Sequence, residues 1–236
     1  MSHRYLNLLK QVTIFRGLGD DALERLASVL KPLEFAKEAL IVGQDDQGDS
    51  LFVIETGKVK VVLYGEKGRE VILTTFKTGD FFGEMSLLDG QPRSANVLAV
   101  ESSRLLMLAR EDFVRTLADY PAMALNILAE MSLRLRHADE IIGNLTLLDV
   151  YGRVARFLIQ LARKDGQNTD EGILIAERPT QQDLAAMLGT SRETVSRVLS
   201  EFQRRGFLSL RGKQVLLSHN FAEQDVFSSD EHSNPD

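Results

Sequence analysis

A heptad repeat in the middle of the chain limits what this sequence can fold into. Between residues 124 and 145, apolar residues recur in steps of four and three. This spacing keeps one stripe of a helix apolar over three heptads and predicts a long helix from Met123 to about Leu148 that forms a parallel coiled-coil homodimer. A helix packed on its own domain is the alternative, although it usually has a wider apolar stripe. The residues of this seam are Ala124, Leu128, Met131, Leu135, Ala138, Ile142 and Leu145.

The sequence before this helix has the pattern of a β-domain. Short aliphatic and β-branched runs alternate with glycines, which predicts a sandwich or barrel that needs no connecting helices. A helix that begins at Asp20 precedes these runs, and a short helix over 111–118 ends before Pro121. The expected strands are 40–42, 51–54, 59–64, 71–76, 96–100 and 103–108.

After the long helix the pattern becomes that of a winged helix-turn-helix. Two helices, 180–189 and 190–205, are joined by a tight turn at Gly189, and a hairpin with a central glycine follows at 207–217. A helix over 150–164, capped by Asp149, and a polar loop over 165–172 come first. We therefore expect an α+β chain with a jelly-roll-like β-roll at 1–120, a dimerisation helix at 121–148, a winged helix-turn-helix at 149–219 and an acidic, disordered tail at 220–236.

Charge is distributed unevenly along these parts. Residues 149–220 carry 11 basic against 8 acidic side chains, whereas residues 1–148 carry 17 against 21. The last sixteen residues carry five acidic side chains and no basic one. The net charge of −6 therefore hides a basic segment where the helix-turn-helix is expected, which favours nucleic acid as a partner.

Composition also excludes several classes of protein. The absence of cysteine rules out disulfides, thiolate metal sites and a cysteine nucleophile. The four histidines have no metal-ligand spacing, and no Ser/His/Asp grouping or nucleotide-binding glycine loop is visible, so we expect neither a metal nor an enzyme. No apolar run is long enough for a membrane span and no signal peptide is visible, so we expect a cytoplasmic protein that does not contact membranes.

The second helix of the pair has one polar and one apolar face. Projection at about 100° per residue turns Arg192, Glu193 and Arg197 outward, near the end of the helix that enters the major groove. Arginine pairs with guanine and glutamate with the cytosine amine. An ordinary Glu193–Arg197 ion pair on a solvated helix is the alternative. The predicted DNA-binding set is Ser191, Arg192, Glu193, Thr194 and Arg197 on this helix, with Thr180, Gln182, Arg211 and Lys213 at phosphates.

Hydroxyl and acidic residues at the start of each helix predict its cap. Thr180 with Asp183, and Thr190 with Glu193, have the spacing of a capping box. Gly189 stands where a helix end favours a left-handed residue.

Two motifs resemble the cyclic-AMP receptor protein/FNR family of bacterial transcription regulators. FGEMSLLDGQPRSANV at 82–97 resembles its phosphate-binding cassette, and TSRETVSRVL at 190–199 resembles its recognition helix. The resemblance extends over about residues 8 to 218. It implies a cyclic-nucleotide-binding β-roll, a homodimer, allosteric control by cyclic AMP or cyclic GMP, double-stranded DNA with TGTGA-like half-sites, and RNA polymerase as a partner.

The cassette has groups that suit a cyclic nucleotide. Gly83 allows close backbone approach, Glu84 can accept a hydrogen bond from a ribose hydroxyl, and Arg93 offers a fixed fork to phosphate oxygens. By resemblance, Ser94 and the amide of Ala95 complete the ribose–phosphate site, and Met85 lies within it.

The long helix departs from the family pattern. In the cyclic-AMP receptor, two consecutive hydroxyl residues meet the adenine amine, the second from the partner subunit. Alignment through GNL (143–145) places Ala138 and Asp139 at these positions. A carboxylate can accept one hydrogen bond from adenine, or two from the N1–H and 2-amino group of guanine. The resemblance of the cassette makes cyclic AMP the first choice, and the carboxylate of Asp139 makes cyclic GMP the second. The alternative for Asp139 is a solvated side chain on an exposed helix flank that contacts no ligand.

Other effectors stay open at this point. The same architecture could respond to cyclic di-GMP, to haem bound through a residue such as His137, or to no ligand. The segment 164–172 does not resemble the polymerase-contacting loop of the cyclic-AMP receptor, so the sequence does not distinguish an activator from a repressor.

Overall fold

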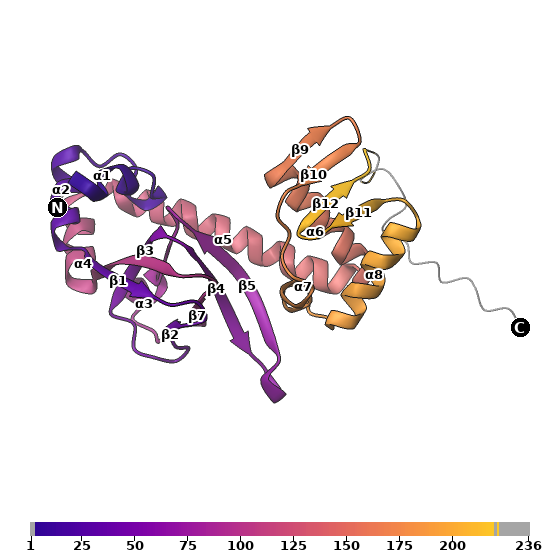
Figure 1. Cartoon of the computed structure of the whole chain (residues 1–236). Helices are drawn as coiled ribbons and strands as arrows, with labels where there is room; N and C mark the ends of the chain where they lie inside the picture. Colours follow the sequence, from indigo (N-terminus) through magenta and orange to yellow (C-terminus); the bar gives the residue numbers. More distant parts are fainter. Residues whose placement is uncertain (1–2, 220, 222–236) are drawn as a thin grey trace, which may run out of the picture. The chain divides into compact units, whose positions relative to one another are not determined.

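The computed structural model describes residues 3–219 and 221. The chain divides into two compact units at the bond between Arg136 and His137. Helix α5 (Ala122–Leu147) carries residues of both units (Figure 1). Within the described residues, no helix is both long enough and apolar enough to cross a membrane.

The first unit contains two antiparallel four-stranded sheets, as the glycine-punctuated pattern predicts. One sheet has the strand order β1-β8-β3-β6 and the other β2-β7-β4-β5. All six expected strands form, and β1 and β6 are additional. The strands of the first sheet are β1 (Lys31–Phe35), β8 (Ser103–Ala109), β3 (Ser50–Thr56) and β6 (Phe81–Phe82). Those of the second are β2 (Leu40–Val42), β7 (Asn96–Ala99), β4 (Lys58–Tyr64) and β5 (Glu70–Lys77).

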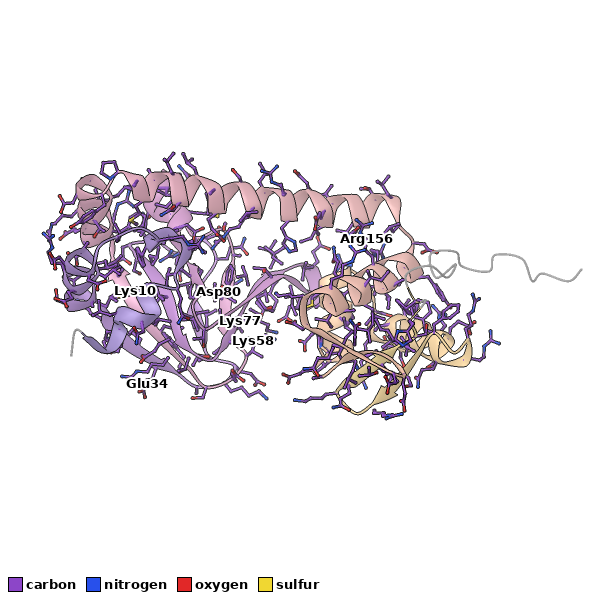
Figure 2. The ribbon with its side chains drawn as sticks, turned by 90° about the horizontal axis from the view of Figure 1, so that it is seen from above. Lys10, Glu34, Lys58, Lys77, Asp80 and Arg156 are labelled. Atoms are coloured by element: carbon purple, nitrogen blue, oxygen red, sulfur yellow. The ribbon has the colours of Figure 1, made fainter. Side chains whose placement is uncertain are left out.

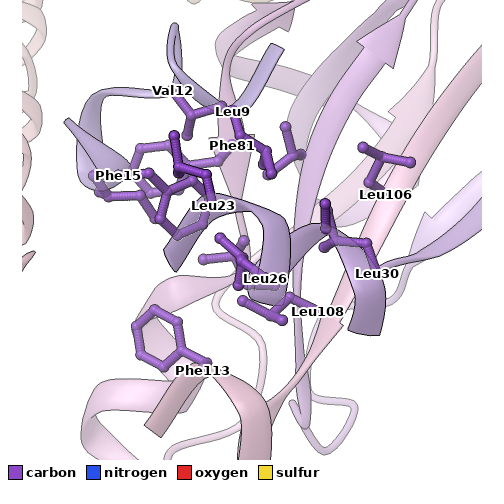
Figure 3. Packing of buried hydrophobic residues seen from close by; sticks show 14 of the residues in the cluster. Leu9, Val12, Phe15, Leu23, Leu26, Leu30, Phe81, Leu106, Leu108 and Phe113 are labelled. Carbon is purple, nitrogen blue, oxygen red and sulfur yellow. The ribbon is translucent and has the colours of Figure 1, made fainter. Parts of the chain in front are cut away.

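Strand β3 is buried on both faces, because its alternating side chains enter two different cores. Phe52 and Ile54 pack between the two sheets, together with Val59 of the second sheet. Leu51 and Val53 belong to the cluster that covers the opposite face (Figure 3). This second cluster draws on α1 (His3–Leu9), the 3-10 turn η1 (Thr13–Phe15), α2 (Asp20–Val29), α4 (Arg110–Asp119) and the first turns of α5.

A short helix within the β-domain contradicts the expectation that no helix connects the strands. Helix α3 (Glu84–Asp89) lies between β6 and β7, with Gly83 and Gly90 at its ends. Both glycines have positive φ, 90° and 72°, so the chain can enter and leave a helix of six residues abruptly. A second short turn, η2 (Glu66–Gly68), connects β4 and β5.

Helix α5 begins and ends within one residue of its predicted limits, and its first half has two apolar faces. Met123 and Ile127 are buried in the core of the first unit, and Met131 of the predicted seam packs against the same cluster. Four other seam residues are largely exposed in the single chain: Leu128 (62%), Leu135 (64%), Ile142 (59%) and Leu145 (46%).

The second unit packs helices on a four-stranded antiparallel sheet with the order β11-β12-β10-β9. The Asp149 carboxylate caps α6, accepting a hydrogen bond of 2.7 Å from the Gly152 amide, as predicted. The other elements are α6 (Val150–Asp165), β9 (Gly166–Thr169), β10 (Gly172–Ile175), α7 (Gln181–Leu188), α8 (Arg192–Arg204), β11 (Leu208–Arg211) and β12 (Gln214–Leu217).

Two expectations for this unit were wrong. The predicted polar loop 165–172 forms the hairpin of β9 and β10; β9 is an exposed edge strand, so its polar residues carry no hydrophobic alternation. Phe221, predicted to begin a disordered tail, is 2% exposed, and its ring centroid lies 5.9 Å from that of Phe202. The rest of the predicted tail, residues 220 and 222–236, lies outside the described residues.

Candidate functional site

The connection from β6 through α3 to β7 brings six of the predicted ligand-binding residues together in the first unit. It holds Gly83, Glu84, Met85, Arg93, Ser94 and Ala95. A Cβ added to Gly83 would lie 2.7 Å from Nη1 of Arg93 and 2.9 Å from the Ser50 carbonyl oxygen. Glycine is therefore needed here for space as well as for its φ of 90°.

Arg93, which is predicted to offer a fixed fork to phosphate oxygens, is buried. Its exposed fraction is 6%. Its Nη1 donates to the Gly83 carbonyl at 2.8 Å and its Nη2 to the Ser50 carbonyl at 2.7 Å. Burial lowers the pKa of Arg93, and the carboxylates of Asp49, Glu84 and Asp46 oppose this shift. Arginine nevertheless stays charged in proteins.

The charge of Arg93 has no close counter-ion. Among the described residues, no carboxylate lies within ion-pair distance of its guanidinium, and the oxygens that accept its hydrogen bonds are neutral. A buried charge is unfavourable unless it is paired. An anion bound beside Arg93 would supply the missing negative charge.

Glu84 supplies the complementary group, a buried acceptor. Its side chain is 1% exposed, and its Oε1 accepts a hydrogen bond of 2.8 Å from Nη1 of Arg134. Its Oε2 is buried and has no hydrogen-bond partner in the described part of the chain. Burial raises the pKa of Glu84, while the positive charge of Arg134 lowers it. The free oxygen could accept a hydrogen bond from a ligand hydroxyl.

Met85 and Ser94, which directly follow the buried Glu84 and Arg93 in the chain, are accessible to solvent. Both are exposed, Met85 at 47%, and the Ser94 Oγ lies 4.0 Å from the Met85 Sδ. Ala95, in contrast, is buried, with 6% exposed. The predicted loop residues thus combine a buried arginine and a buried carboxylate, which do not pair with each other, with an accessible hydroxyl.

Arg134 of α5 contacts this loop but is not among the predicted site residues. Besides its bond to Glu84, it donates from Nη2 to the Phe81 carbonyl at 2.9 Å. Its guanidinium lies 5.0 Å from the ring centroid of Phe76 and 4.7 Å from that of Phe81. Arg134 stands one helical turn before Ala138, and this spacing could have identified it as a neighbour of the predicted base-contacting positions.

Ala138 and Asp139 lie on the part of α5 that belongs to the second unit, and both are exposed. The structure therefore gathers the loop residues but does not place these two relative to them. Among the described residues, no cluster of three or more potential metal ligands occurs.

In the second unit, α7 and α8 form the predicted helix pair. The Thr180 Oγ1 caps α7 by accepting from the Asp183 amide at 3.1 Å, and Gly189 ends it with a φ of 63°. The cap of α8 differs from the prediction: Ser191, not Thr190, accepts from the Thr194 amide at 3.1 Å. Both Thr180 and Ser191 thus have structural roles as well as lying on the predicted DNA-binding face.

The two faces of α8 are as the projection predicts. Val195, Val198, Leu199 and Phe202 are at most 1% exposed, whereas Arg192, Glu193 and Arg197 are exposed. The alternative Glu193–Arg197 ion pair does not form. Within the described residues, none of these three charged side chains has a hydrogen-bond or ion-pair partner, so all three are available to a ligand.

The hairpin of β11 and β12 presents Arg211 and Lys213 on both sides of Gly212, whose φ is 63°. Each has a loose acidic partner: Arg211 Nη2 lies 3.6 Å from Glu171 and Lys213 Nζ 3.4 Å from Glu177. All four side chains are at least 69% exposed, and such surface pairs contribute little stability. Gln182 is also exposed.

Comparison with known proteins identifies both domains. The family model of the cyclic nucleotide-binding domain matches residues 32–120, and that of the Crp-like helix-turn-helix domain matches residues 152–221. A CRP-like cAMP-activated global transcriptional regulator of Mycobacterium tuberculosis is 33% identical over 211 residues, 89% of this chain and 94% of that protein. The chain belongs to the CRP/FNR family. It is thus a transcription regulator with a cyclic-nucleotide-binding domain and a DNA-binding helix-turn-helix domain, not an enzyme.

Other CRP/FNR proteins show the range of this family. The cyclic AMP receptor protein of Thermus thermophilus is 35% identical over 202 residues, 86% of this chain and 90% of that protein. The solved structure of the c-di-GMP-responsive global regulator CLP of Xanthomonas campestris aligns with a TM-score of 0.74 at 26% identity, covering 85% of this chain and 99% of that one. Because these related proteins are named for different effectors, membership of the family does not by itself define the effector of this chain.

Proposed function

We propose that this protein is a dimeric transcription regulator whose affinity for DNA is controlled by a cyclic nucleotide, with cyclic AMP first and cyclic GMP second. One observation carries the choice of effector: the same loop buries an arginine without a counter-ion and a carboxylate with a free oxygen. A cyclic nucleotide offers the matching groups, a phosphodiester anion and a ribose 2′-hydroxyl.

In this proposal Arg93 balances the charge of the phosphate and Glu84 accepts the hydroxyl through Oε2. Arg134 holds the other oxygen of Glu84, which keeps the carboxylate oriented. The exposed Ser94 hydroxyl adds a donor at the mouth. The cAMP-activated regulator of Mycobacterium tuberculosis and the cyclic AMP receptor protein of Thermus thermophilus support cyclic AMP. The carboxylate of Asp139 supports cyclic GMP.

The exposed part of the α5 seam supports the dimer. Leu128, Leu135, Ile142 and Leu145 recur at heptad spacing and are solvated in the single chain. Pairing of two α5 helices would bury them. The effector would then act by stabilising one arrangement of the dimer over another.

DNA recognition is assigned to the exposed face of α8. Two recognition helices about 34 Å apart would read a palindrome of TGTGA-like half-sites. Arg192, Glu193 and Arg197 are exposed and would contact bases. The phosphate contacts would come from Thr180, Gln182, Arg211 and Lys213. RNA polymerase is the expected protein partner at the promoter.

Calorimetric titration of the full chain with cyclic AMP, cyclic GMP and cyclic di-GMP tests the effector. We expect binding of cyclic AMP, or else of cyclic GMP, and at least a tenfold weaker Kd for Arg93→Gln, because the phosphate loses its charged partner. Arg115→Gln, a change at a 68% exposed arginine in the same unit, is the matched control and should bind as the parent does. Binding of cyclic di-GMP alone, or equal affinity of Arg93→Gln and the parent, would contradict the proposal.

A further inference from the structure

Three polar residues of α5 connect the effector loop with the N-terminal turn η1. Asn126, Glu130 and Arg134 are spaced four residues apart and so lie on one face of the helix. The Asn126 side chain donates to the Arg16 carbonyl at 2.8 Å, and the Thr13 hydroxyl donates to Glu130 Oε2 at 3.2 Å. Glu130 thus stands between the contact to η1 and Arg134, which contacts Glu84.

Arg134 therefore faces two carboxylates. Glu84 binds its Nη1 at 2.8 Å, and Glu130 Oε1 lies 3.5 Å from its Nε. The Nε is buried and has no hydrogen bond within the described residues, so the Glu130 contact acts as a charge interaction rather than a directed bond. The carboxylates of Glu84 and Glu130 thus lie on either side of the Arg134 guanidinium, next to the loop where we expect an anionic effector to bind.

Glu130 adds little to the geometry of Arg134. The guanidinium is already held by Glu84, by the Phe81 carbonyl and by the rings of Phe76 and Phe81. A pocket of about 200 Å³ lies beside Glu130 and Arg134 and is lined by further polar residues, among them Asp80. Asp80 lies in the β5–β6 turn and is labelled in Figure 2. Asp80 accepts a hydrogen bond from the Lys77 amide, and no cation of the described residues is within ion-pair distance of Glu130 except Arg134.

We propose that Glu130 acts on the effector site through its charge and not by holding Arg134 in place: it offsets part of the positive charge of the Arg134 guanidinium and weakens the binding of a phosphate-bearing effector. This inference rests on the proposed cyclic-nucleotide function and adds the residue that sets its affinity. The side chain of Glu130 is 21% exposed, so water and salt screen its charge only in part.

The test compares Glu130→Gln with the parent chain by titration with cyclic AMP and cyclic GMP at 25 mM and 500 mM salt. The amide oxygen can still accept from Thr13, so the change removes charge but keeps the contact with η1. At low salt we expect Kd to fall roughly 3- to 10-fold, because the change removes one partly screened negative charge from the neighbourhood of the effector site. At high salt the difference should shrink towards twofold, which a purely structural effect would not do.

Two controls complete the experiment. Glu130→Asp keeps the charge and should restore a Kd within about twofold of the parent. Asn126→Ala breaks the contact with η1 on the same face without a change of charge and should also stay within about twofold. An unchanged or weaker Kd for Glu130→Gln at low salt, or a gain that is independent of salt, overturns this inference alone if the parent binds. If the parent binds neither nucleotide, the proposed function fails and the inference fails with it.

Discussion

The effector loop and the recognition helix hold their charges in opposite ways. In the loop, Arg93 and Glu84 are buried and fixed by neighbouring oxygens and by Arg134. On α8, Arg192, Glu193 and Arg197 are solvated and without partners in the described chain. A buried group cannot be removed without leaving others unsatisfied, whereas an exposed one can. Changes in the loop should therefore affect both stability and binding, and changes on α8 should affect binding alone.

The largest expected effect is on DNA binding by Arg192→Ala. Loss of a base contact weakens the binding free energy by about 1–3 kcal/mol per half-site, and a dimer bound to a palindrome loses this contact in both half-sites. The free energy of unfolding should stay within about 0.5 kcal/mol of the parent, because the side chain is exposed. Band-shift titration with a TGTGA palindrome and urea unfolding measure the two quantities.

Arg156→Ala is the matched control, since it removes an exposed positive charge from α6 in the same unit (Figure 2). It should weaken specific and non-specific duplexes alike. Arg192→Ala should instead reduce the preference for the palindrome, and equal preference in both variants would show that Arg192 does not read bases.

The next effect concerns stability in the loop. Gly83→Ala would add a Cβ within 3 Å of Arg93 and Ser50 at a φ of 90°, and we expect a loss of about 2–4 kcal/mol of unfolding free energy. Gly90→Ala at the other end of α3 has a φ of 72° but no atom within 4 Å of the added Cβ. It should cost only about 1–2 kcal/mol, the strain alone. Equal losses in urea unfolding would mean that the close approach to Arg93 is unimportant.

The smallest effect is expected at the wing. Lys213→Ala should weaken DNA binding to a similar extent for every sequence and lower the salt slope by about one per protomer. Its ion pair with Glu177 is exposed, so its loss should leave stability unchanged within about 0.5 kcal/mol. Titrations of specific and scrambled duplexes over a range of salt concentrations measure this. A sequence-dependent loss would assign Lys213 to base contact instead.

Local patterns predicted the parts of the fold that carry a buried apolar run or a buried apolar face. The continuous apolar run at 51–54 indicated strand β3, which is buried on both faces, and the apolar face at Val195 and Val198 indicated helix α8. Elements without such a face were missed. Strand β9 is polar throughout, and α3 has only six residues between two glycines.

The sequence identified the loop that carries the effector site, but not the residues from other elements that contact this loop. The motif identified Glu84 and Arg93, but nothing local shows that both are buried or that Ser50 holds Arg93, because Ser50 comes from another strand. Arg134 lies fifty residues from Glu84, and their contact depends on how α5 packs against the sheets. The cap of α8 shows the same limit on a smaller scale, since the capping-box spacing from Thr190 to Glu193 indicated Thr190, whereas the neighbouring Ser191 forms the cap.

Control of DNA binding by the effector requires energetic coupling between the two ligands, and reciprocal titration measures this coupling directly. Cyclic AMP is titrated into the protein with and without a saturating TGTGA palindrome, and the duplex is titrated with and without saturating cyclic AMP. We expect each ligand to tighten the other by one common factor, between about 5- and 150-fold, because binding free energies are reciprocal. If cyclic AMP binds with the same Kd whether or not the duplex is present, the nucleotide does not control DNA binding.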